Sequence, residues 1–430
     1  MMRIEDIYKI YQLHPSVQTD TRQLRQGDLF FALKGDRFNG NLFAAQALAS
    51  GAAYAIVDQK DDKPGNTDRM ILVDDVLKTL QDLAKFHRQQ LNIPFLAITG
   101  SNGKTTTKEL VHAVLSSTLR TYTTQGNLNN HIGIPLTILR VQDNAQMAVI
   151  EMGANHLGEI AGYCQYALPT HAIITNCGKA HLEGFGSIEG VRKGKGELYD
   201  YIRATGGTAF VMWDYDYLRQ MSQGIERIVT YGTAEASTTG QILRSEPFLE
   251  VAMTRGVLQE EIPTKLVGSY NLPNVLAAVA VGAQFGISPQ KIKSAIQHYI
   301  PSNSRSQLLE IDSNKFIMDA YNANPSSMQA AIENFANLVA ENKILVLGAM
   351  AELGQDSVVE HQQLVGHIQK HPWKEVLLVG GNFLKTNHPY RSFENVQQAK
   401  QWLQKQNFHN AYFLVKGSRS MQMEKILEKD

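Results

Sequence analysis

A glycine-rich segment between an apolar strand and a helical segment limits the possible folds of this chain more than any other feature. Gly100-Ser101-Asn102-Gly103-Lys104-Thr105 directly follows apolar residues 95–99, and the pattern predicts a helix over 105–119. Backbone N–H groups of such a loop can bind phosphate oxygens, and the helix N-terminus adds positive potential. Lys104 can reach the outer phosphates, and the Thr105 hydroxyl can ligate Mg²⁺. The segment therefore predicts a nucleotide-binding domain with a parallel sheet.

The loop differs from the general phosphate-binding pattern in one respect. The gap between its first glycine and the Gly-Lys pair is two residues shorter, so that Ile98 stands where the first glycine would fall. An ordinary strand-to-helix turn is the alternative interpretation. The strand, the glycines, Lys104, Thr105 and the helix all occur in order, and this favours the phosphate-binding interpretation.

The chain divides into three blocks, which we expect to be domains over 1–92, 93–301 and 302–430. A length of 430 residues agrees with two or three domains. Because strands alternate with helices, we expect an α/β protein with a smaller N-terminal domain, a central parallel-sheet domain and a second open α/β domain. The expected helices lie at 43–50, 76–90 and 105–119. The expected strands lie at 28–33, 53–57, 95–99, 147–150, 172–175, 316–318, 344–347, 376–379 and 412–415.

Composition excludes several classes of protein. Lys plus Arg and Asp plus Glu both number 41, which argues against a strongly basic nucleic-acid binder or an acidic solvating chain. Two cysteines, Cys164 and Cys177, cannot form a disulfide scaffold or a four-cysteine zinc site. The start of the chain lacks the basic and apolar segments of a signal peptide, and the longest apolar candidate, 275–283, is too short to span a bilayer. We therefore expect a cytoplasmic protein.

Polar residues follow the apolar strands of the central block. Glu151 ends one strand and offers the hard oxygen that a nucleotide-bound Mg²⁺ needs, although an exposed glutamate at a strand end is common. The segment NCGKAHLEGFG over 176–186 follows another strand, where open α/β sheets place their ligands. His181 can ligate a metal or cap the loop, and composition alone favours the cap. The basic cluster around Lys195 can be a solvated turn, and Cys177 is interpreted as a buried or half-buried thiol.

The third block has two polar loops after strands. DAYNANP over 319–325 offers an acid for a ribose hydroxyl, an aromatic ring for stacking, and amides. KGSR over 416–419 places two cations beside a glycine, where they can neutralise a transferring phosphate. Each loop alone can be an ordinary turn, but two of them on one sheet indicate a functional edge.

Together these segments resemble the Mur ligases of peptidoglycan synthesis over essentially the whole chain. Within that family the chain is most similar to the member that joins D-alanyl-D-alanine to UDP-N-acetylmuramoyl-tripeptide, because DAYNANP occurs together with ELG over 352–354. The most specific segments are 99–106, 126–135, 151–154, 176–186, 195–197, 319–325, 348–354 and 416–419.

The resemblance implies a role for each domain. The first would bind the UDP of the precursor, the central one would bind ATP, and the third, Rossmann-like, would close over the site. The implied UDP and substrate residues are Thr21 and Arg22 after Asp20, Gly35, Phe38, Asn127, Asn129, Asn130, Asn322, Asn324, Lys416 and Arg419. The implied ATP residues are Gly100, Ser101, Asn102, Gly103, Lys104, Thr105, Thr106, Asn271, Asn274, Arg305 and Asp319.

The resemblance also implies the chemistry. Lys104, Glu151, His181 and Lys195 are the implied catalytic residues, and Thr105, Glu151, His181 and Lys195 the implied ligands of two Mg²⁺ ions. Lys195 matches a lysine that family members carry as a carbamate, an anion that can bind Mg²⁺ where an ammonium would repel it. The implied reaction is ATP-dependent amide formation through an acyl phosphate. We expect a monomer that binds no nucleic acid.

The sequence leaves three other interpretations of the function open. The chain can be a related ligase with another acceptor, such as a folylpolyglutamate synthetase. It can be a P-loop kinase or switch protein that forms no amide. It can also be a binding protein that keeps the fold without catalysis, although the intact set of Lys104, Glu151, His181 and Lys195 argues against this.

Overall fold

The N-terminal region contains a small parallel sheet flanked by helices. The computed structural model describes residues 2–59, 67–302 and 305–428. The sheet has the order β1-β2-β5-β6, and a short antiparallel pair, β3 and β4, lies beside it. The elements are α1 (Ile4–Leu13), β1 (Val17–Gln18), β2 (Leu29–Phe31), β3 (Lys34–Gly35), β4 (Phe38–Asn39), α2 (Ala44–Ala49), β5 (Tyr54–Val57), β6 (Met70–Leu72) and α3 (Val76–Gln90).

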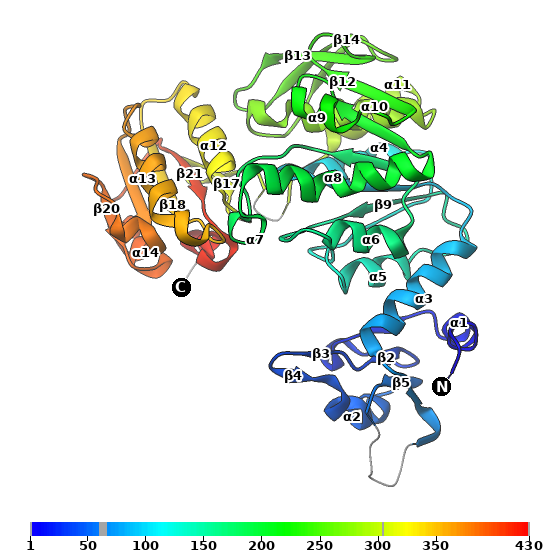
Figure 1. The fold of residues 1–430 in the computed structure, drawn as a ribbon. Coiled ribbons are helices and arrows are strands. Elements are labelled where there is room, and N and C mark those ends of the chain that lie inside the picture. The colour runs from blue at the N-terminus through cyan, green and yellow to red at the C-terminus, as the bar shows by residue number, and fades with distance from the viewer. Residues whose placement is uncertain (1, 60–66, 303–304, 429–430) are drawn as a thin grey trace.

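Helix α3 connects this region to the central one (Figure 1). It begins where the Asp75 side chain accepts a hydrogen bond from the Lys78 backbone N–H, an N-cap. Its apolar face, including Leu80 and Leu83, is fully buried and belongs to the same hydrophobic core as the central strands. This hydrophobic core contains residues from both sides of the expected boundary between 92 and 93. Packing therefore does not separate the N-terminal domain from the central one, and this boundary stays a prediction.

The central region contains a nine-stranded sheet with the order β15-β14-β13-β12-β11-β10-β7-β9-β8. Strands β7 to β13 pair in parallel, whereas β14 and β15 are antiparallel additions at one edge. The strands are β7 (Phe95–Thr99), β8 (Thr121–Thr123), β9 (Met147–Glu151), β10 (His171–Ile174), β11 (Thr208–Met212), β12 (Arg227–Gly232), β13 (Thr238–Arg244), β14 (Glu250–Arg255) and β15 (Glu261–Pro263). The helices are α4 (Lys104–Ser116), α5 (Gly133–Ile138), α6 (Glu159–Ala167), α7 (Leu182–Phe185), α8 (Ile188–Thr205), α9 (Asp216–Met221), α10 (Leu272–Gln284) and α11 (Pro289–His298).

The C-terminal region has a six-stranded sheet of its own, with the order β16-β17-β21-β18-β19-β20. Only β16 is antiparallel to its neighbour, and two hydrophobic clusters pack on the two faces of the sheet. The elements are β16 (Gln307–Ile311), β17 (Asn314–Asp319), α12 (Pro325–Asn337), β18 (Lys343–Gly348), α13 (Ser357–Ile368), β19 (Glu375–Val379), β20 (Arg391–Phe393), α14 (Val396–Gln404) and β21 (Tyr412–Lys416). Short 3-10 helices lie at Thr21–Gln23, Gly40–Phe43, Thr67–Arg69, Ser269–Asn271, Gly354–Asp356, Gly381–Lys385, Arg419–Met421 and Met423–Leu427.

The α/β architecture and every strand expected from the sequence are confirmed. The helix expected over 105–119 ends three residues earlier, at Ser116, and the one expected over 43–50 is Ala44–Ala49. The apolar segment 275–283 lies inside α10, and among the described residues no helix combines the length and the apolar content needed to cross a bilayer. The expected parallel sheet of the central domain is confirmed over β7 to β13, and β14 and β15 extend its edge in the antiparallel sense.

The parallel strands bring the predicted polar loops to one edge. Strands β10, β7 and β9 are neighbours, so the segments that follow Ile174, Thr99 and Glu151 leave the sheet at the same side. Parallel α/β sheets bind their ligands at this carboxyl edge. In Figure 1 the C-terminal domain lies beside α7, so that its own polar loops approach the same edge.

Candidate active site

The glycine loop adopts a backbone that side chains would not allow. Gly100 has φ +143° and Gly103 has φ +78°, a region that residues other than glycine rarely occupy. A Cβ at Gly100 would lie 2.0 Å from Thr175 Oγ1, and one at Gly103 would lie 2.6 Å from Asn274 Oδ1. Both glycines are therefore needed for the loop to pack between its neighbours and to open α4.

Lys104, the first residue of α4, lies folded over the loop. Its Nζ donates hydrogen bonds to the carbonyl oxygens of Gly100, at 2.6 Å, and Ser101, at 3.2 Å. Burial lowers the pKa of Lys104, whereas the nearby charge of Glu151 opposes this shift. The ammonium is held by neutral carbonyls and not by a carboxylate, so it can exchange these contacts for those of an anionic ligand.

Glu151 is a buried carboxylate surrounded by neutral donors. It is 2% exposed, and it accepts hydrogen bonds from Thr105 Oγ1 at 2.9 Å and from Asn129 Nδ2 at 2.8 Å. Within the described residues it forms no ion pair. A buried carboxylate without a counter-ion is costly, and the hard oxygens of Glu151 and Thr105 are of the kind that Mg²⁺ prefers. The residues present therefore fit a divalent cation.

Lys195 lies on α8, beneath the wall of the site. It is 1% exposed, its Nζ donates to the carbonyl oxygen of Ala154 at 2.9 Å, and it lies 5.1 Å from the centre of the Phe185 ring. Burial lowers its pKa to about 7, and the positive charge of Lys104 adds to this effect. A lysine in these surroundings has a neutral, nucleophilic amine available near neutral pH.

His181 faces an acid from the C-terminal domain. It precedes α7 with φ +52°, and its Nδ1 lies 2.6 Å from Glu352 Oε2. The pair is supported by a main-chain hydrogen bond from Glu183 N to the carbonyl oxygen of Glu352, at 3.3 Å. The hydrogen bond from His181 lowers the pKa of Glu352. This contact orients the imidazole and leaves its Nε2 for another partner.

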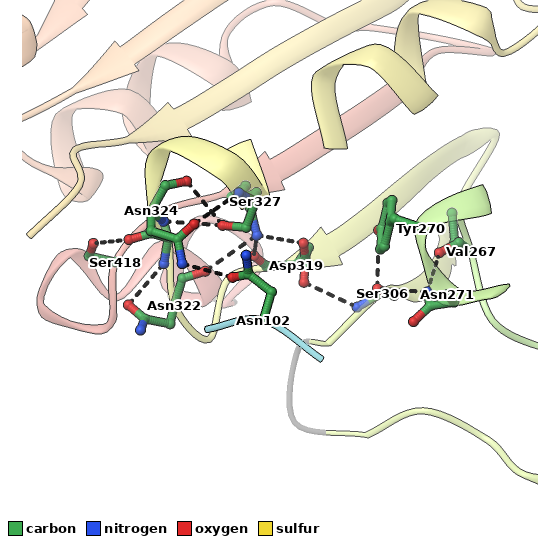
Figure 2. Close-up of polar contacts among 12 residues, drawn as sticks. Asn102, Val267, Tyr270, Asn271, Ser306, Asp319, Asn322, Asn324, Ser327 and Ser418 are labelled. Atoms are coloured by element: carbon green, nitrogen blue, oxygen red, sulfur yellow. Dashed lines mark hydrogen bonds and ion pairs between the residues drawn. The ribbon is translucent and has the colours of Figure 1, made fainter. Parts of the chain in front are cut away.

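Two predicted nucleotide residues of the central domain, Asn271 and Asn274, are joined by a hydrogen bond, and Figure 2 shows Asn271 beside Val267, Tyr270 and Ser306. Asn271 Nδ2 donates to the carbonyl oxygen of Val267 at 2.9 Å, and Asn274 Nδ2 donates to Asn271 Oδ1 at 2.8 Å. The Tyr270 hydroxyl lies 3.1 Å from Ser306 Oγ, which ties this cluster to the start of the C-terminal domain. The two asparagines are buried and held in fixed orientations, and Asn274 Oδ1 also accepts a hydrogen bond from Thr107 Oγ1 of α4, at 3.0 Å.

The C-terminal domain contributes an ion pair at the ends of two adjacent strands. Lys416 Nζ lies 2.6 Å from Asp319 Oδ2 and also donates to the Asn322 carbonyl oxygen at 3.3 Å. Asn324 Nδ2 donates to Asn102 Oδ1 at 2.7 Å, and so links this domain directly to the glycine loop (Figure 2). Asn324 also caps α12 by accepting from Ser327 N.

These elements enclose a cavity of about 890 Å³ between the central and C-terminal domains. Its volume lies near the upper end of the range of about 300–1,000 Å³ that is typical of pockets for small molecules and cofactors. The predicted site residues that line it are Ser101, Asn102, Gly103, Lys104, Thr105, Thr106, Asn129, Asn130, Glu151, His181, Asn271, Asn274, Arg305, Asp319, Asn322, Asn324 and Lys416.

Other predicted residues lie outside this cavity lining. Gly100 and Asn127 are further back on their loops, and Lys195 is beneath the wall. Arg419 forms an ion pair of 2.6 Å with Glu424 instead of pointing at a phosphate position. Cys177, by contrast, belongs to the cavity lining; it is buried, within the expectation of a buried or half-buried thiol, and burial raises its pKa to about 12.

The predicted UDP residues lie in the N-terminal domain, apart from the cavity (Figure 1). Thr21 and Arg22 are in a short 3-10 helix, where Arg22 pairs with Asp20 at 2.7 Å. Phe38, which is 53% exposed, stacks on Phe43 with ring centres 5.4 Å apart, and Gly35 is exposed beside it. An exposed, supported aromatic ring offers a face on which a base can stack.

Three family models match successive parts of the chain. They are the Mur ligase family catalytic domain over 15–88, the Mur ligase middle domain over 98–282, and the Mur ligase glutamate ligase domain over 304–419. The protein named "UDP-N-acetylmuramoyl-tripeptide--D-alanyl-D-alanine ligase" of Bacillus subtilis is 35% identical over 427 residues, which are 96% of this chain and 92% of that protein. The chain belongs to the Mur ligase family. The protein of the same name from Escherichia coli is 34% identical with the same coverage.

Solved structures of Mur ligases have the same fold. "Crystal structure I of MurF from Acinetobacter baumannii" has a TM-score of 0.85 at 29% identity, and the similarity covers 97% of both chains. The MurF ligase of Thermotoga maritima in complex with ADP has a TM-score of 0.85 at 26% identity, covering 99% of this chain and 97% of that one. A folylpolyglutamate synthase of Mycobacterium tuberculosis has a TM-score of 0.61 at 13% identity, a similarity of fold alone.

One contact in this Mur ligase was not foreseen as functional. Glu197, two residues after Lys195 on α8, accepts hydrogen bonds from Gly158 N at 2.6 Å and Ala161 N at 2.9 Å. Its carboxylate thus caps the N-terminus of α6 from a neighbouring helix. Lys195 donates to Ala154, which lies between Glu151 and α6. Glu197 and Lys195 together therefore hold the segment that connects Glu151 to α6. The spacing of KGE over 195–197 was the only sequence signal for this pair.

Proposed function

We propose that this Mur ligase joins D-alanyl-D-alanine to UDP-N-acetylmuramoyl-tripeptide and converts ATP to ADP and phosphate. The observation that carries the proposal is the similarity over 96% of the chain to relatives that bear this name. The geometry supports it, because a phosphate-type loop and a buried carboxylate line one cavity of adequate size, and the buried Lys195 donates to Ala154 of that lining. The reaction produces the UDP-linked pentapeptide.

In this proposal the glycine loop and α4 hold the ATP phosphates. The helix N-terminus provides positive potential, and Lys104 exchanges the loop carbonyls for the outer phosphates. Asn271 and Asn274 lie beside the loop and are assigned to the adenine. Arg305, whose guanidinium lies 3.6 Å from the centre of the Tyr321 ring, is assigned to the nucleotide, and Asp319 to the ribose.

Mg²⁺ is the proposed metal, and the oxygens of Thr105 and Glu151 fit it. When bound, Mg²⁺ would neutralise charge on the phosphate oxygens during transfer. Binding of two ions is part of the proposal, with His181 and Lys195 as the further ligands. His181 is oriented by Glu352, the kind of outer contact that fixes a ligating imidazole.

Lys195 can serve as a ligand only if its charge changes sign. Its amine would attack CO₂ to form a carbamate, with loss of one proton, and an ammonium would thereby be replaced by an anion. Burial and the neighbouring charge of Lys104 both disfavour the ammonium. We therefore assign Lys195 as a carbamate that binds Mg²⁺.

The proposed reaction proceeds in two steps. A carboxylate oxygen of the tripeptide attacks the γ-phosphorus of ATP, ADP leaves, and an acyl phosphate forms. The amine of D-alanyl-D-alanine then attacks the acyl carbon, loses a proton, and expels phosphate. Water must be excluded because it would hydrolyse the acyl phosphate. Contacts between the domains serve this purpose: Asn102 with Asn324 at 2.7 Å, and Lys179 with Glu360 at 2.6 Å.

The precursor would extend between two domains. Its UDP is assigned to Thr21, Arg22, Gly35 and Phe38 of the N-terminal domain. Its peptide would reach the cavity near Asn127, Asn129 and Asn130, and the dipeptide would meet Asn322, Asn324, Lys416 and Arg419. Because Arg419 pairs with Glu424 in this structure, its role requires that this exposed pair open.

Oxygen transfer tests the proposed acyl phosphate. We expect that a tripeptide whose terminal carboxylate carries ¹⁸O in both oxygens delivers one labelled oxygen to the released phosphate, because the carboxylate oxygen leaves with it. Mass spectrometry of the phosphate and of the pentapeptide measures the label. A control in ¹⁸O-labelled water with unlabelled tripeptide should give unlabelled phosphate. Label that enters from water and not from the carboxylate would contradict the mechanism.

A further inference from the structure

A histidine-rich cluster lies on the C-terminal domain, outside the cavity described above. It consists of Glu333 on α12, His367 in the last turn of α13, and His371 one turn later along the chain. One ligand atom from each residue lies within 4.8 Å of the other two. None of the three lines the active-site cavity.

We propose that Glu333, His367 and His371 form a binding site for a divalent transition metal, with Zn²⁺ as the best fit. Two imidazoles and one carboxylate are a donor set that zinc uses in proteins, with a fourth position left for water or another ligand. The same donors suit Co²⁺ and Ni²⁺, whereas Mg²⁺ and Ca²⁺ prefer oxygen ligands only.

The geometry agrees with this assignment. Ligand atoms around a tetrahedral zinc lie about 3.3 Å apart, because each metal–ligand bond is about 2.0–2.2 Å long. His367 Nε2 lies 3.1 Å from Glu333 Oε1, close to this separation. The ligand atom of His371 lies within 4.8 Å of the other two, so His371 would complete the set by moving closer to them.

The surroundings of the cluster leave its donor atoms available. His367 is 8% exposed, and its Nε2 is a buried atom without a hydrogen-bond partner in the described chain, although the Glu333 carboxylate lies beside it. His371 is half-buried, and its imidazole lies beside the rings of His367 and Trp373, with ring centres 5.9 Å away in both cases. A bound metal would provide a partner for the buried Nε2 of His367 and would also be coordinated by His371.

Binding would connect two helices that matter to the active site. Helices α12 and α13 pack against each other (Figure 1), and α12 carries at its N-terminus Asn324, the residue that contacts the glycine loop. A metal held by both helices would stabilise the C-terminal domain without touching the substrates. The site would thus be structural or regulatory.

The test is a titration of the untagged, full-length protein with Zn²⁺ in competition with a chromophoric chelator, with Mg²⁺ in excess to occupy other cation sites. We expect the wild-type protein to bind one more equivalent of Zn²⁺ than His371→Gln or Glu333→Gln. The matched control is His409→Gln, which removes an exposed histidine elsewhere on the same domain and should behave as wild type. Co²⁺ should give visible ligand-field absorption that both site variants lose.

Thermal unfolding gives a second measurement. Zn²⁺ should raise the Tm of the wild type and of His409→Gln, but not that of His371→Gln, and without metal the three proteins should keep similar circular dichroism. Equal Zn²⁺ binding by wild type and both site variants would overturn the proposal, and so would failure of the folded wild type to bind the additional equivalent. The cluster would then be an ion pair between two helices.

Discussion

Replacing Lys104 with alanine is expected to lower ATP-dependent phosphate release by about 1,000-fold or more, because a single positioned charge contributes about this much to phosphoryl transfer. Among the described residues, the Lys104 ammonium donates to the carbonyls of Gly100 and Ser101, and it can exchange these contacts for the phosphates. The side chain contributes little to the core, since it lines the cavity. The loss should therefore be catalytic and not structural.

Steady-state kinetics with saturating substrates measure this loss, and circular dichroism reports whether the variant is folded. Lys291→Ala is the matched control, because Lys291 is an exposed lysine on α11 whose Nζ donates to the Thr118 hydroxyl, and it should retain wild-type activity. A folded Lys104→Ala protein with more than a tenth of the wild-type rate would show that Lys104 does not neutralise the transferring phosphate.

Replacing Lys195 with alanine is expected to lower the rate by about 100-fold or more. Loss of a residue that merely orients a metal ligand already lowers metal affinity or activity by about 10–100-fold, and loss of the ligand itself should cost at least as much. The side chain is 1% exposed, so the substitution leaves a small cavity beneath the wall of the site. A short carboxylate such as formate or acetate can enter that cavity and supply the missing anionic oxygen. We therefore expect activity to recover in part when these acids are added.

Lys193→Ala is the control for this substitution, since Lys193 is an exposed lysine two residues earlier on α8. It should show neither loss nor response to added acids. Recovery of Lys195→Ala by carboxylates but not by methylamine separates the anionic role from simple filling of the cavity. A fully active Lys195→Ala would exclude Lys195 from the metal site.

The parts of the fold that depend on local pattern were predictable from the sequence. The strands at 95–99 and 147–150 are continuous apolar runs, and such runs fit strands that are buried on both faces of a parallel sheet. The glycine loop was predictable because its backbone requires glycine. The φ angles and close neighbours of Gly100 and Gly103 exclude side chains there, so the loop is visible in the sequence as glycines. The carboxyl-edge rule then placed Glu151 beside the loop before any contact was known.

The parts that depend on distant contacts were not predictable. The pair of His181 and Glu352 joins loops of two different domains, and no pattern in either loop predicts that they meet. The antiparallel edge strands β14 and β15 are only half-buried, and they give a weaker pattern than the continuous apolar runs of β7 and β9. The hydrogen bond between Asn102 and Asn324 depends on how the domains dock, which no local pattern determines. Arg419 was expected to reach the substrate, yet a carboxylate five residues later holds it.

The most direct test of the proposed function is the dependence of phosphate release on both substrates. Phosphate release from ATP would be followed with UDP-N-acetylmuramoyl-tripeptide alone, with D-alanyl-D-alanine alone, and with both, and the product would be weighed by mass spectrometry. We expect phosphate release only with both substrates, in equal amounts with a UDP-linked pentapeptide. Release without the dipeptide, or no pentapeptide with any tripeptide, would contradict it and favour a kinase-like protein or a ligase with another acceptor.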